Sequence, residues 1–245
     1  MSISSTSNVM EKTDIRELPI PFSAPMVRAL PAGTKTQTRR ALRVQPDAHH
    51  WESLPGYELK RSKLVTINER IAVKFSHSIP QNQQWDTALD WLLCPYGQPG
   101  DRLWVREAWR AKVQFDHEPP RNIPECAPVR YEAAGMHFPD GQWGKYRHAR
   151  FMCRWMSRTL LEVTEVRVQR LQDITEEDAQ AEGIAAHRKG GWWWEQPPAG
   201  IEGTNHFGAK TARDAYMALW EQINGAGSWD ANPWVWAVSF KRITS

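Results

Sequence analysis

Cysteine and long apolar runs are both scarce in this sequence of 245 residues. Its three cysteines, Cys94, Cys126 and Cys153, include no C-x-x-C pair, which excludes a disulfide framework and a zinc ribbon. We expect all three to be ordinary buried thiols. No apolar run approaches the roughly 20 residues that a membrane-spanning helix needs, and the N-terminus has no apolar core. We therefore expect a cytoplasmic protein with no membrane partner.

Several signatures of catalysis and cofactor binding are also missing. The sequence contains neither a Walker A loop nor a glycine-rich dinucleotide fingerprint, and no plausible Ser-His-Asp order. Its eight histidines are scattered, with His49-His50 the only adjacent pair, so no metal site can be assembled from them. We expect no metal and no organic cofactor.

The charge balance is close to neutral. Lys and Arg number 31 against 28 Asp and Glu, a net charge of +3. Such a value is modest for a protein that must hold a long nucleic-acid backbone. The balance of 24% charged and 41% hydrophobic residues is typical of a globular protein.

Tryptophan is unusually abundant, with 14 residues against 5 Tyr and 7 Phe. Most of these side chains are expected to fill core, since indole is a large apolar group with one donor. Stacking on a planar ligand is the other common use. The triplet Trp192–Trp194, in a glycine-rich segment, is compatible with a lid that stacks on a base, an interface or an unstructured patch.

Local patterns predict few regular elements, separated by long irregular segments. A short helix begins after Ser23, with proline in its first turn, and ends at Gly33. A second helix begins at Thr175, with acidic residues in its first turn, and ends at Gly183. A third covers Ala209–Ile223, and a fourth is possible at Asp86–Leu93. The expected strands are Leu64–Phe75, Leu103–Trp109, Val129–Glu132, Thr159–Leu171 with a bulge near Thr164–Glu165, and a final strand with Trp234, Trp236, Val238 and Phe240 on one face.

This order favours an α+β fold, a small mixed β-barrel with short helices around it, over a doubly wound sheet. We expect residues 1–17 to be a disordered tail and residues 18–245 to form one domain. The irregular stretches at about 44–98, 111–157 and 187–208 are interpreted as insertions.

The segment 33–43 follows the first helix and holds four basic residues and no acid. Lys35, Arg39 and Arg40 could hold a phosphate or a nucleic-acid backbone, while Thr36 and Thr38 offer hydroxyl groups. The alternative is a solvated basic turn.

A family resemblance rests on four pieces in order along the chain. They are Gly33-x-Lys35-x-x-Thr38-x-Arg40 after a short helix, Gly100-Asp101-x-Leu103-x-Val105, the helix ending Ala181-Glu182-Gly183, and the closing strand Trp234–Phe240. Together they resemble an ASCH domain, a PUA-like β-barrel family linked to RNA and modified nucleosides. The tryptophan-rich ending Gly227–Trp236 is similar to the larger ASCH proteins of phages and prophages.

One branch of that family removes the acetyl group from N(4)-acetylcytidine with a Lys, a Thr and a Glu. The resemblance implies that Lys35, Thr38 and Glu182 are the catalytic residues here. Amide hydrolysis needs a nucleophile, a proton acceptor and oxyanion stabilisation. We assign Thr38 as nucleophile, Lys35 as its activator or the oxyanion stabiliser, and Glu182 as proton shuttle.

Four further residues are expected at the substrate: Thr36, Arg39, Arg40 and Glu107. Glu107 also has a structural alternative, pairing with arginines beside its strand. The first functional hypothesis is an amidohydrolase of an N-acylated cytidine or related nucleobase, with a free nucleoside as substrate. A non-catalytic reader of RNA or modified bases and a ribonuclease stay open as alternatives.

Overall fold

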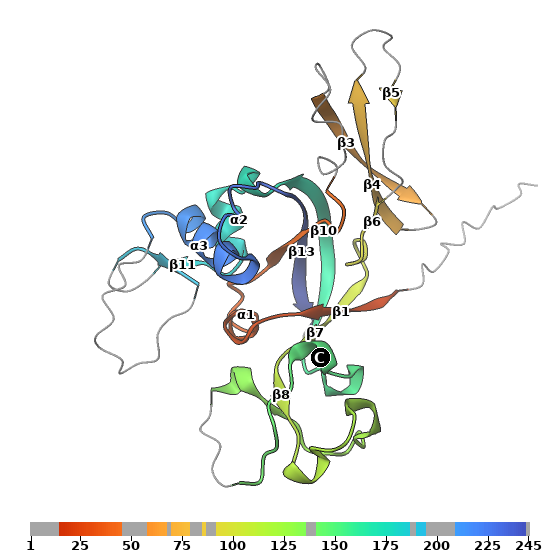
Figure 1. Ribbon diagram of the computed structural model, residues 1–245, viewed down its shortest axis with the longest axis vertical. Coiled ribbons are helices and arrows are strands. Elements are labelled where there is room, and N and C mark those ends of the chain that lie inside the picture. Colours follow the sequence, from red (N-terminus) through yellow and green to blue (C-terminus); the bar gives the residue numbers. More distant parts are fainter. Residues whose placement is uncertain are drawn as a thin grey trace, which may run out of the picture.

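The computed structural model describes residues 15–45, 58–67, 70–78, 85–86, 92–135, 141–186, 190–194 and 209–243. Its centre is a five-stranded sheet of order β1-β7-β10-β13-β2 (Figure 1). β1 runs parallel to β7, and all other neighbours are antiparallel. The bounds are β1 (Glu17–Pro21), β7 (Arg102–Arg106), β10 (Leu160–Arg170), β13 (Trp234–Ile243) and β2 (Gln37–Ala41).

The expected α+β class is therefore confirmed. Among the described strands, no ladder joins β1 to β2, so hydrogen bonding leaves this sheet open at both edges. β2 is one of the two edges and pairs, among the strands that the structure describes, with β13 alone.

The long pair β10 and β13 forms the middle of the sheet. Its register shifts between Val163 and Glu165, which confirms the predicted bulge and returns apolar residues to the buried face. Trp236, Val238 and Phe240 are buried in one core cluster with residues from β1, β7 and α1. The predicted apolar face of the final strand is thus confirmed.

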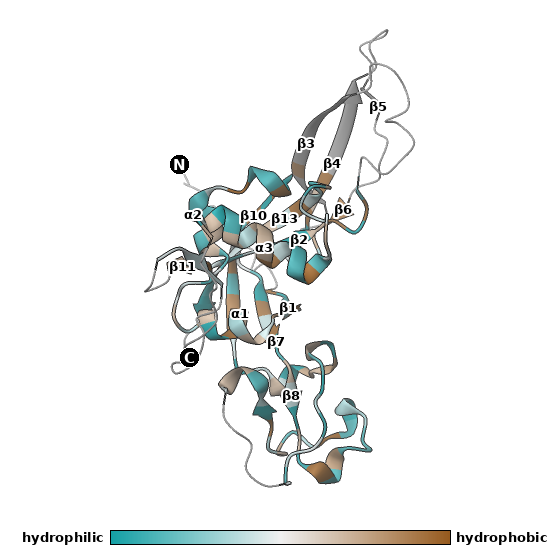
Figure 2. Cartoon of the chain, turned by 60° about the vertical axis from the view of Figure 1, so that its left-hand side comes forward, coloured by the Kyte–Doolittle hydropathy of each residue, from teal (hydrophilic) through white to brown (hydrophobic). Residues whose placement is uncertain are grey.

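In the described part of the chain, three α-helices accompany the sheet: α1 (Ala24–Ala29), α2 (Glu176–Ala181) and α3 (Ala212–Asn224). The Thr175 side chain caps α2 by accepting a hydrogen bond from the Asp178 amide at 3.1 Å, as its sequence predicts. α3 begins three residues later than expected, because Thr211 caps it by accepting from the Asp214 amide at 3.0 Å. Figure 2 shows α2 as mostly hydrophilic beside the more apolar central strands.

The segment 58–93 differs from its prediction. The single strand expected at Leu64–Phe75 is two strands, β3 (Glu58–Ile67) and β4 (Arg70–Ser78), paired as an antiparallel hairpin. The helix expected at Asp86–Leu93 is wrong at both ends. Asp86 belongs to β5 (Trp85–Asp86), and the last two residues form β6 (Leu92–Leu93); both strands pair with β4. The residues between them lie outside the described part.

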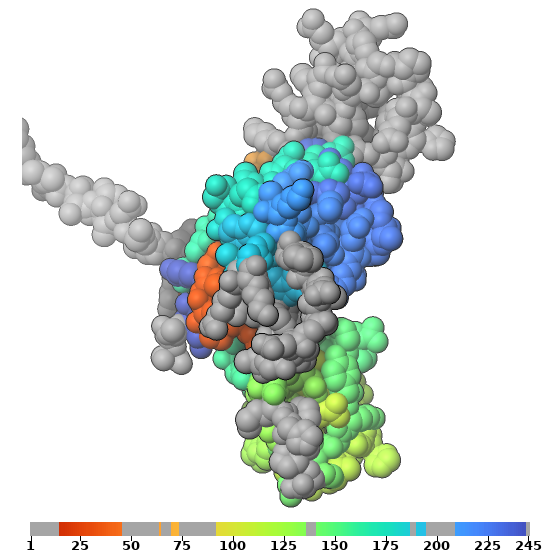
Figure 3. Space-filling model, turned by 90° about the vertical axis from the view of Figure 1, so that its left-hand side faces the viewer, coloured from red at the N-terminus to blue at the C-terminus, as the bar shows by residue number. Residues whose placement is uncertain are grey.

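Residues 107–135 and 141–157 form a lobe with its own apolar core, which includes Trp109, Met152 and Met156. It appears in green below α2 and α3 in Figure 3. The strand expected through Trp109 ends at Arg106, and a separate β8 (Trp109–Arg110) pairs with β9 (Arg130–Tyr131). Short 3₁₀ helices fill the lobe: η3 (Val113–Phe115), η4 (Pro120–Asn122), η5 (Glu132–Ala134), η6 (Ala149–Phe151) and η7 (Arg154–Met156).

Two further predictions need correction. The fold begins before Leu18, because Glu17 starts β1 and the buried Asp101 accepts a hydrogen bond from the Arg16 amide at 3.2 Å; residues 1–14 of the expected tail lie outside the described part. Of the three cysteines expected to be buried, only Cys94 is; Cys153 is half-buried and Cys126 is exposed.

The expected loop 187–208 is described only at 190–194. There β12 (Trp192–Trp193) pairs with β11 (Ala185–Ala186), so the segment contains a strand. Trp192 and Trp194 pack against the core cluster of α2, α3 and η8 (Leu171–Asp173).

Candidate functional site

The site forms where the edge strand β2 meets the end of α2. Lys35 and Glu182 form an isolated antiparallel bridge, and the Thr36 amide donates to the Ala181 carbonyl at 2.8 Å. Gly183 then turns the chain with φ +100°, a conformation that a residue with a side chain rarely adopts. Two segments 147 residues apart in sequence are thereby held backbone to backbone.

The Lys35 side chain is fully buried and ion-paired. Its Nζ lies 2.9 Å from Glu182 Oε2 and donates as well to the carbonyl oxygens of Gln37 and Glu182, each at 2.9 Å. An ammonium group has three N–H donors, so all three are used. Burial lowers the pKa of Lys35 below its ordinary value; Arg40 and Arg39 lower it further, and the Glu182 carboxylate opposes them.

The other carboxylate oxygen of Glu182 faces two further groups. Tyr216 Oη donates to Glu182 Oε1 at 3.4 Å, and Arg39 Nη1 lies 3.6 Å from the same oxygen. Burial raises the pKa of the Tyr216 phenol well above its ordinary value, and the neighbouring carboxylate adds to this. The phenol therefore stays protonated and serves as a donor.

A second carboxylate, Asp178 in the first turn of α2, fixes Arg39. Arg39 Nη2 lies 2.7 Å from Asp178 Oδ2, and Arg167 Nη2 lies 3.0 Å from Asp178 Oδ1. Gln37 Nε2 donates to Asp178 at 3.1 Å. Burial raises the pKa of Asp178, but the guanidinium groups and this amide outweigh it and hold the pKa below its ordinary value.

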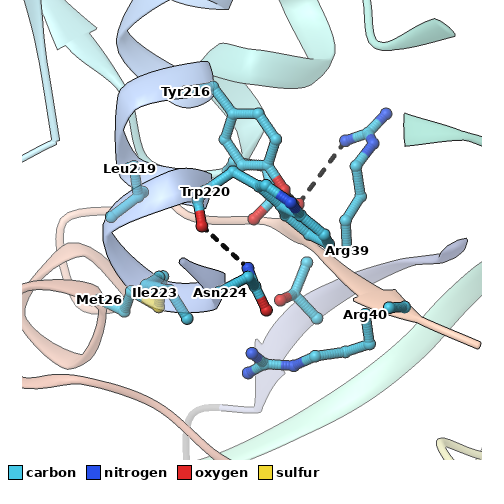
Figure 4. Close-up of a pocket in the computed structure, with 11 residues that line it drawn as sticks. Met26, Arg39, Arg40, Tyr216, Leu219, Trp220, Ile223 and Asn224 are labelled. Carbon is cyan, nitrogen blue, oxygen red and sulfur yellow. Dashed lines mark hydrogen bonds and ion pairs between the residues drawn. The ribbon is translucent and has the colours of Figure 1, made fainter. Parts of the chain in front are cut away.

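A cavity of about 50 Å³ adjoins this network (Figure 4). Tyr216 and Trp220 reach toward it from α3, while Arg39 and Arg40 reach it from β2. One water molecule needs about 10–15 Å³ of cavity volume. The cavity therefore has room for a group the size of an acyl amide. The full lining is Met26, Thr38, Arg39, Arg40, Ala41, Glu182, Tyr216, Leu219, Trp220, Ile223 and Asn224.

Two buried donors of the lining have no hydrogen-bond partner within the described chain: Arg39 Nε and Trp220 Nε1. The Thr38 residue is 1% exposed, and its hydroxyl likewise makes no hydrogen bond to any described residue. Buried donors are nearly always satisfied in folded proteins. A cavity lined by unpaired donors is therefore suited to a ligand that brings an acceptor such as a carbonyl oxygen.

The structure brings together five of the seven predicted site residues: Lys35, Thr38, Arg39, Arg40 and Glu182. Lys35 contacts Glu182 but does not itself line the cavity. Burial of Lys35 and Arg39, each 2% exposed, also excludes the solvated basic turn as an account of these two residues.

Thr36 and Glu107 are not brought to the cavity. Thr36 precedes β2, and its side chain is exposed. Glu107 is buried elsewhere and accepts hydrogen bonds from Arg158 at 2.8 and 2.9 Å. Its structural alternative, pairing with an arginine, is the one observed.

Three residues of the site are not among the predicted ones: Tyr216 and Trp220 from α3, and Asp178 from α2. Tyr216 and Trp220 are four residues apart and so share one helix face. That spacing is the only signal that could have placed them together.

Comparisons of the chain with models of protein families, with curated proteins and with solved structures give no match. In the described part of the chain, no group of three or more His, Cys, Asp or Glu side chains could hold a metal ion. None of the described helices has the length and apolarity to span a bilayer.

Proposed function

We propose that this protein is an amidohydrolase that removes the acyl group from an N(4)-acylated cytidine or a related N-acylated nucleoside. The observation that carries the proposal is the cavity that combines the free hydroxyl of Thr38, the buried carboxylate of Glu182 and two unpaired donors. We also propose that the sheet belongs to an ASCH-like, PUA-like domain interrupted by the three insertions.

Thr38 is the nucleophile in this proposal. Its Oγ attacks the acyl carbonyl carbon while Glu182 accepts the hydroxyl proton. Arg39 Nε and Trp220 Nε1 donate to the carbonyl oxygen as it gains negative charge. The carbon–nitrogen bond then breaks, and the proton on Glu182 passes to the departing amine.

Water completes the reaction by hydrolysing the ester on Thr38. Glu182 takes one proton from the attacking water and returns it to the Thr38 oxygen as the carboxylic acid leaves. The enzyme is thus restored, and one water has been consumed for each amide bond broken.

Lys35 acts as a positioning residue for Glu182. All three of its N–H donors are used on Glu182 and Gln37, so the ammonium form has neither a donor for the oxyanion nor a lone pair for the Thr38 proton. This favours Glu182 over Lys35 as the group that accepts the proton.

The size of the cavity orients the substrate. The acyl amide of the substrate enters the cavity. The base and sugar lie at its opening beside Ile223 and Asn224, both of which are exposed. This arrangement suits a small nucleoside.

The test is the ultraviolet spectrum of N(4)-acetylcytidine incubated with the native protein, Thr38→Val and Thr36→Val. Thr36 is the matched control, because it lies two residues away on the same segment but is exposed. The native protein and Thr36→Val should form cytidine at rates within about twofold, since surface substitutions rarely matter, and Thr38→Val should form none.

Intact acetylcytidine with the native protein would refute hydrolysis of this substrate. If the nucleoside then binds the native protein but not Thr38→Val, the cavity binds a modified base without hydrolysing it. Equal loss of activity in both threonine variants would refute the assignment of Thr38.

A further inference from the structure

A second concave site lies between β7 and the lobe, a groove of about 530 Å³. Trp104 and Arg106 come from β7, Arg121 from η4, and the segment Arg150–Arg154 from η6 and η7. Its volume falls within the range of about 300–1,000 Å³ that ligand sites occupy. None of the seven predicted site residues lines it.

The groove is strongly cationic. Four of its ten lining residues are arginines, and none is acidic. Arg154 is ion-paired with Glu17 at 2.8 Å. Within the described chain, Arg106, Arg121 and Arg150 have no carboxylate partner, so three guanidinium groups can bind an anion.

Aromatic and apolar groups form the rest of the lining. The Arg106 guanidinium carbon lies 4.5 Å from the centre of the Trp104 ring, and that of Arg150 lies 4.7 Å from the Phe151 ring. Phe151 is 49% exposed, so part of its ring is open to contact with a ligand. Arg106 Nε is a buried donor that no described residue satisfies.

We infer that this groove binds a single strand of nucleic acid. Guanidinium groups bind phosphates in a bidentate manner, and an exposed aromatic ring such as that of Phe151 stacks on bases of any sequence. A strand presents one phosphate per nucleotide, which matches three arginines without a carboxylate partner in the described chain better than a nucleoside monophosphate does. Unstacked bases are available in single strands but not inside a duplex.

The groove is built on packed elements of the lobe and of β7. Met152 belongs both to the groove and to the buried core of the lobe, and the Arg106 side chain donates to the Arg150 carbonyl at 3.3 Å. The arginines are thus presented on packed elements. This inference is independent of the proposed hydrolysis, because the two sites share no residue.

The test measures fluorescence anisotropy of a labelled ten-residue oligouridylate with the full chain. The double variant Arg121→Glu/Arg150→Glu reverses two exposed charges of the groove, and Lys210→Glu/Arg242→Glu reverses two exposed charges elsewhere. We expect the groove variant to raise Kd at least about tenfold and the control to stay within about twofold. The slope of log K against log salt should fall by about 1.4 in the groove variant, since each phosphate contact contributes about 0.7.

A third variant, Phe151→Ala, tests stacking without a change of charge, and should weaken binding about fivefold or more. Equal losses in the two charge-reversed proteins, or no binding by the native protein, would overturn the inference. A duplex that binds as tightly as the single strand, or uridine monophosphate that displaces the strand at equal concentration, would also overturn it. Thermal melts confirm folding, and N(4)-acetylcytidine turnover by each variant reports separately on the cavity.

Discussion

The substitution Glu182→Gln provides a sharp test of the buried ion pair. It keeps the size of the side chain and leaves an amide oxygen near Lys35, but removes the negative charge. The Lys35 ammonium would then be fully buried with only neutral acceptors, a situation that proteins relieve by releasing the proton.

The ordinary pKa of lysine sets an upper limit to the free energy of unfolding that Glu182→Gln can lose through Lys35. Releasing a proton from a lysine with an ordinary pKa of 10.5 costs about 1.4 kcal/mol per pH unit, or about 5 kcal/mol at pH 7. Removing one partner of a buried pair typically costs about 3–5 kcal/mol, within this bound. At pH 9 the bound falls to about 2 kcal/mol. The unfolded variant binds more protons than the folded one, so its stability rises with pH in this range.

Urea unfolding at pH 7 and pH 9 of the native protein, Glu182→Gln, Lys35→Met and the double variant measures these free energies. We expect Glu182→Gln to lose about 3–5 kcal/mol at pH 7 and about 2 kcal/mol or less at pH 9. The double variant should lose less than the sum of the two single variants. A loss under about 1 kcal/mol that does not change with pH would refute the buried ion pair.

Three other predictions concern residues around the site. Thr38→Val should abolish deacylation but change the free energy of unfolding by less than about 1 kcal/mol, because the hydroxyl has no partner in the described chain; melts and turnover check this. Asp178→Asn should destabilise the protein at pH 6, and the loss should shrink as the pH falls below 3.8, because a carboxyl with a lowered pKa contributes stability that is lost as pH falls through its folded value; urea unfolding over this pH range tests it. Arg158→Ala should cost about 1–3 kcal/mol by leaving Glu107 unpaired and leave deacylation unchanged, and a lower turnover would show that Glu107 serves the reaction.

Elements with local signals were predictable from the sequence. The cap at Thr175, the bulge before Glu165 and the apolar face of β13 each depend on residues close together in the chain. Elements that depend on distant pairing were not. β2 escaped prediction because Gln37, Thr38 and Arg39 are polar yet buried, which hides the alternation of an ordinary strand.

The candidate site was only partly predictable. The pairing of Lys35 with Glu182 follows from a family resemblance, since no periodicity relates residues 147 apart. The roles of Tyr216 and Trp220 could not be foreseen, because the pattern that packs a helix face against a core also describes a face that lines a cavity.

The measurement that tests the proposed chemistry most directly is the mass of the intact protein, acid-quenched during its first turnovers of N(4)-acetylcytidine. The account predicts a protein heavier by one acetyl group, with the label on the peptide that contains Thr38, and no such species in Thr38→Val. Release of cytidine without any acetylated protein would contradict the role of Thr38 as nucleophile. Absence of both cytidine and acetylated protein would contradict the hydrolase itself.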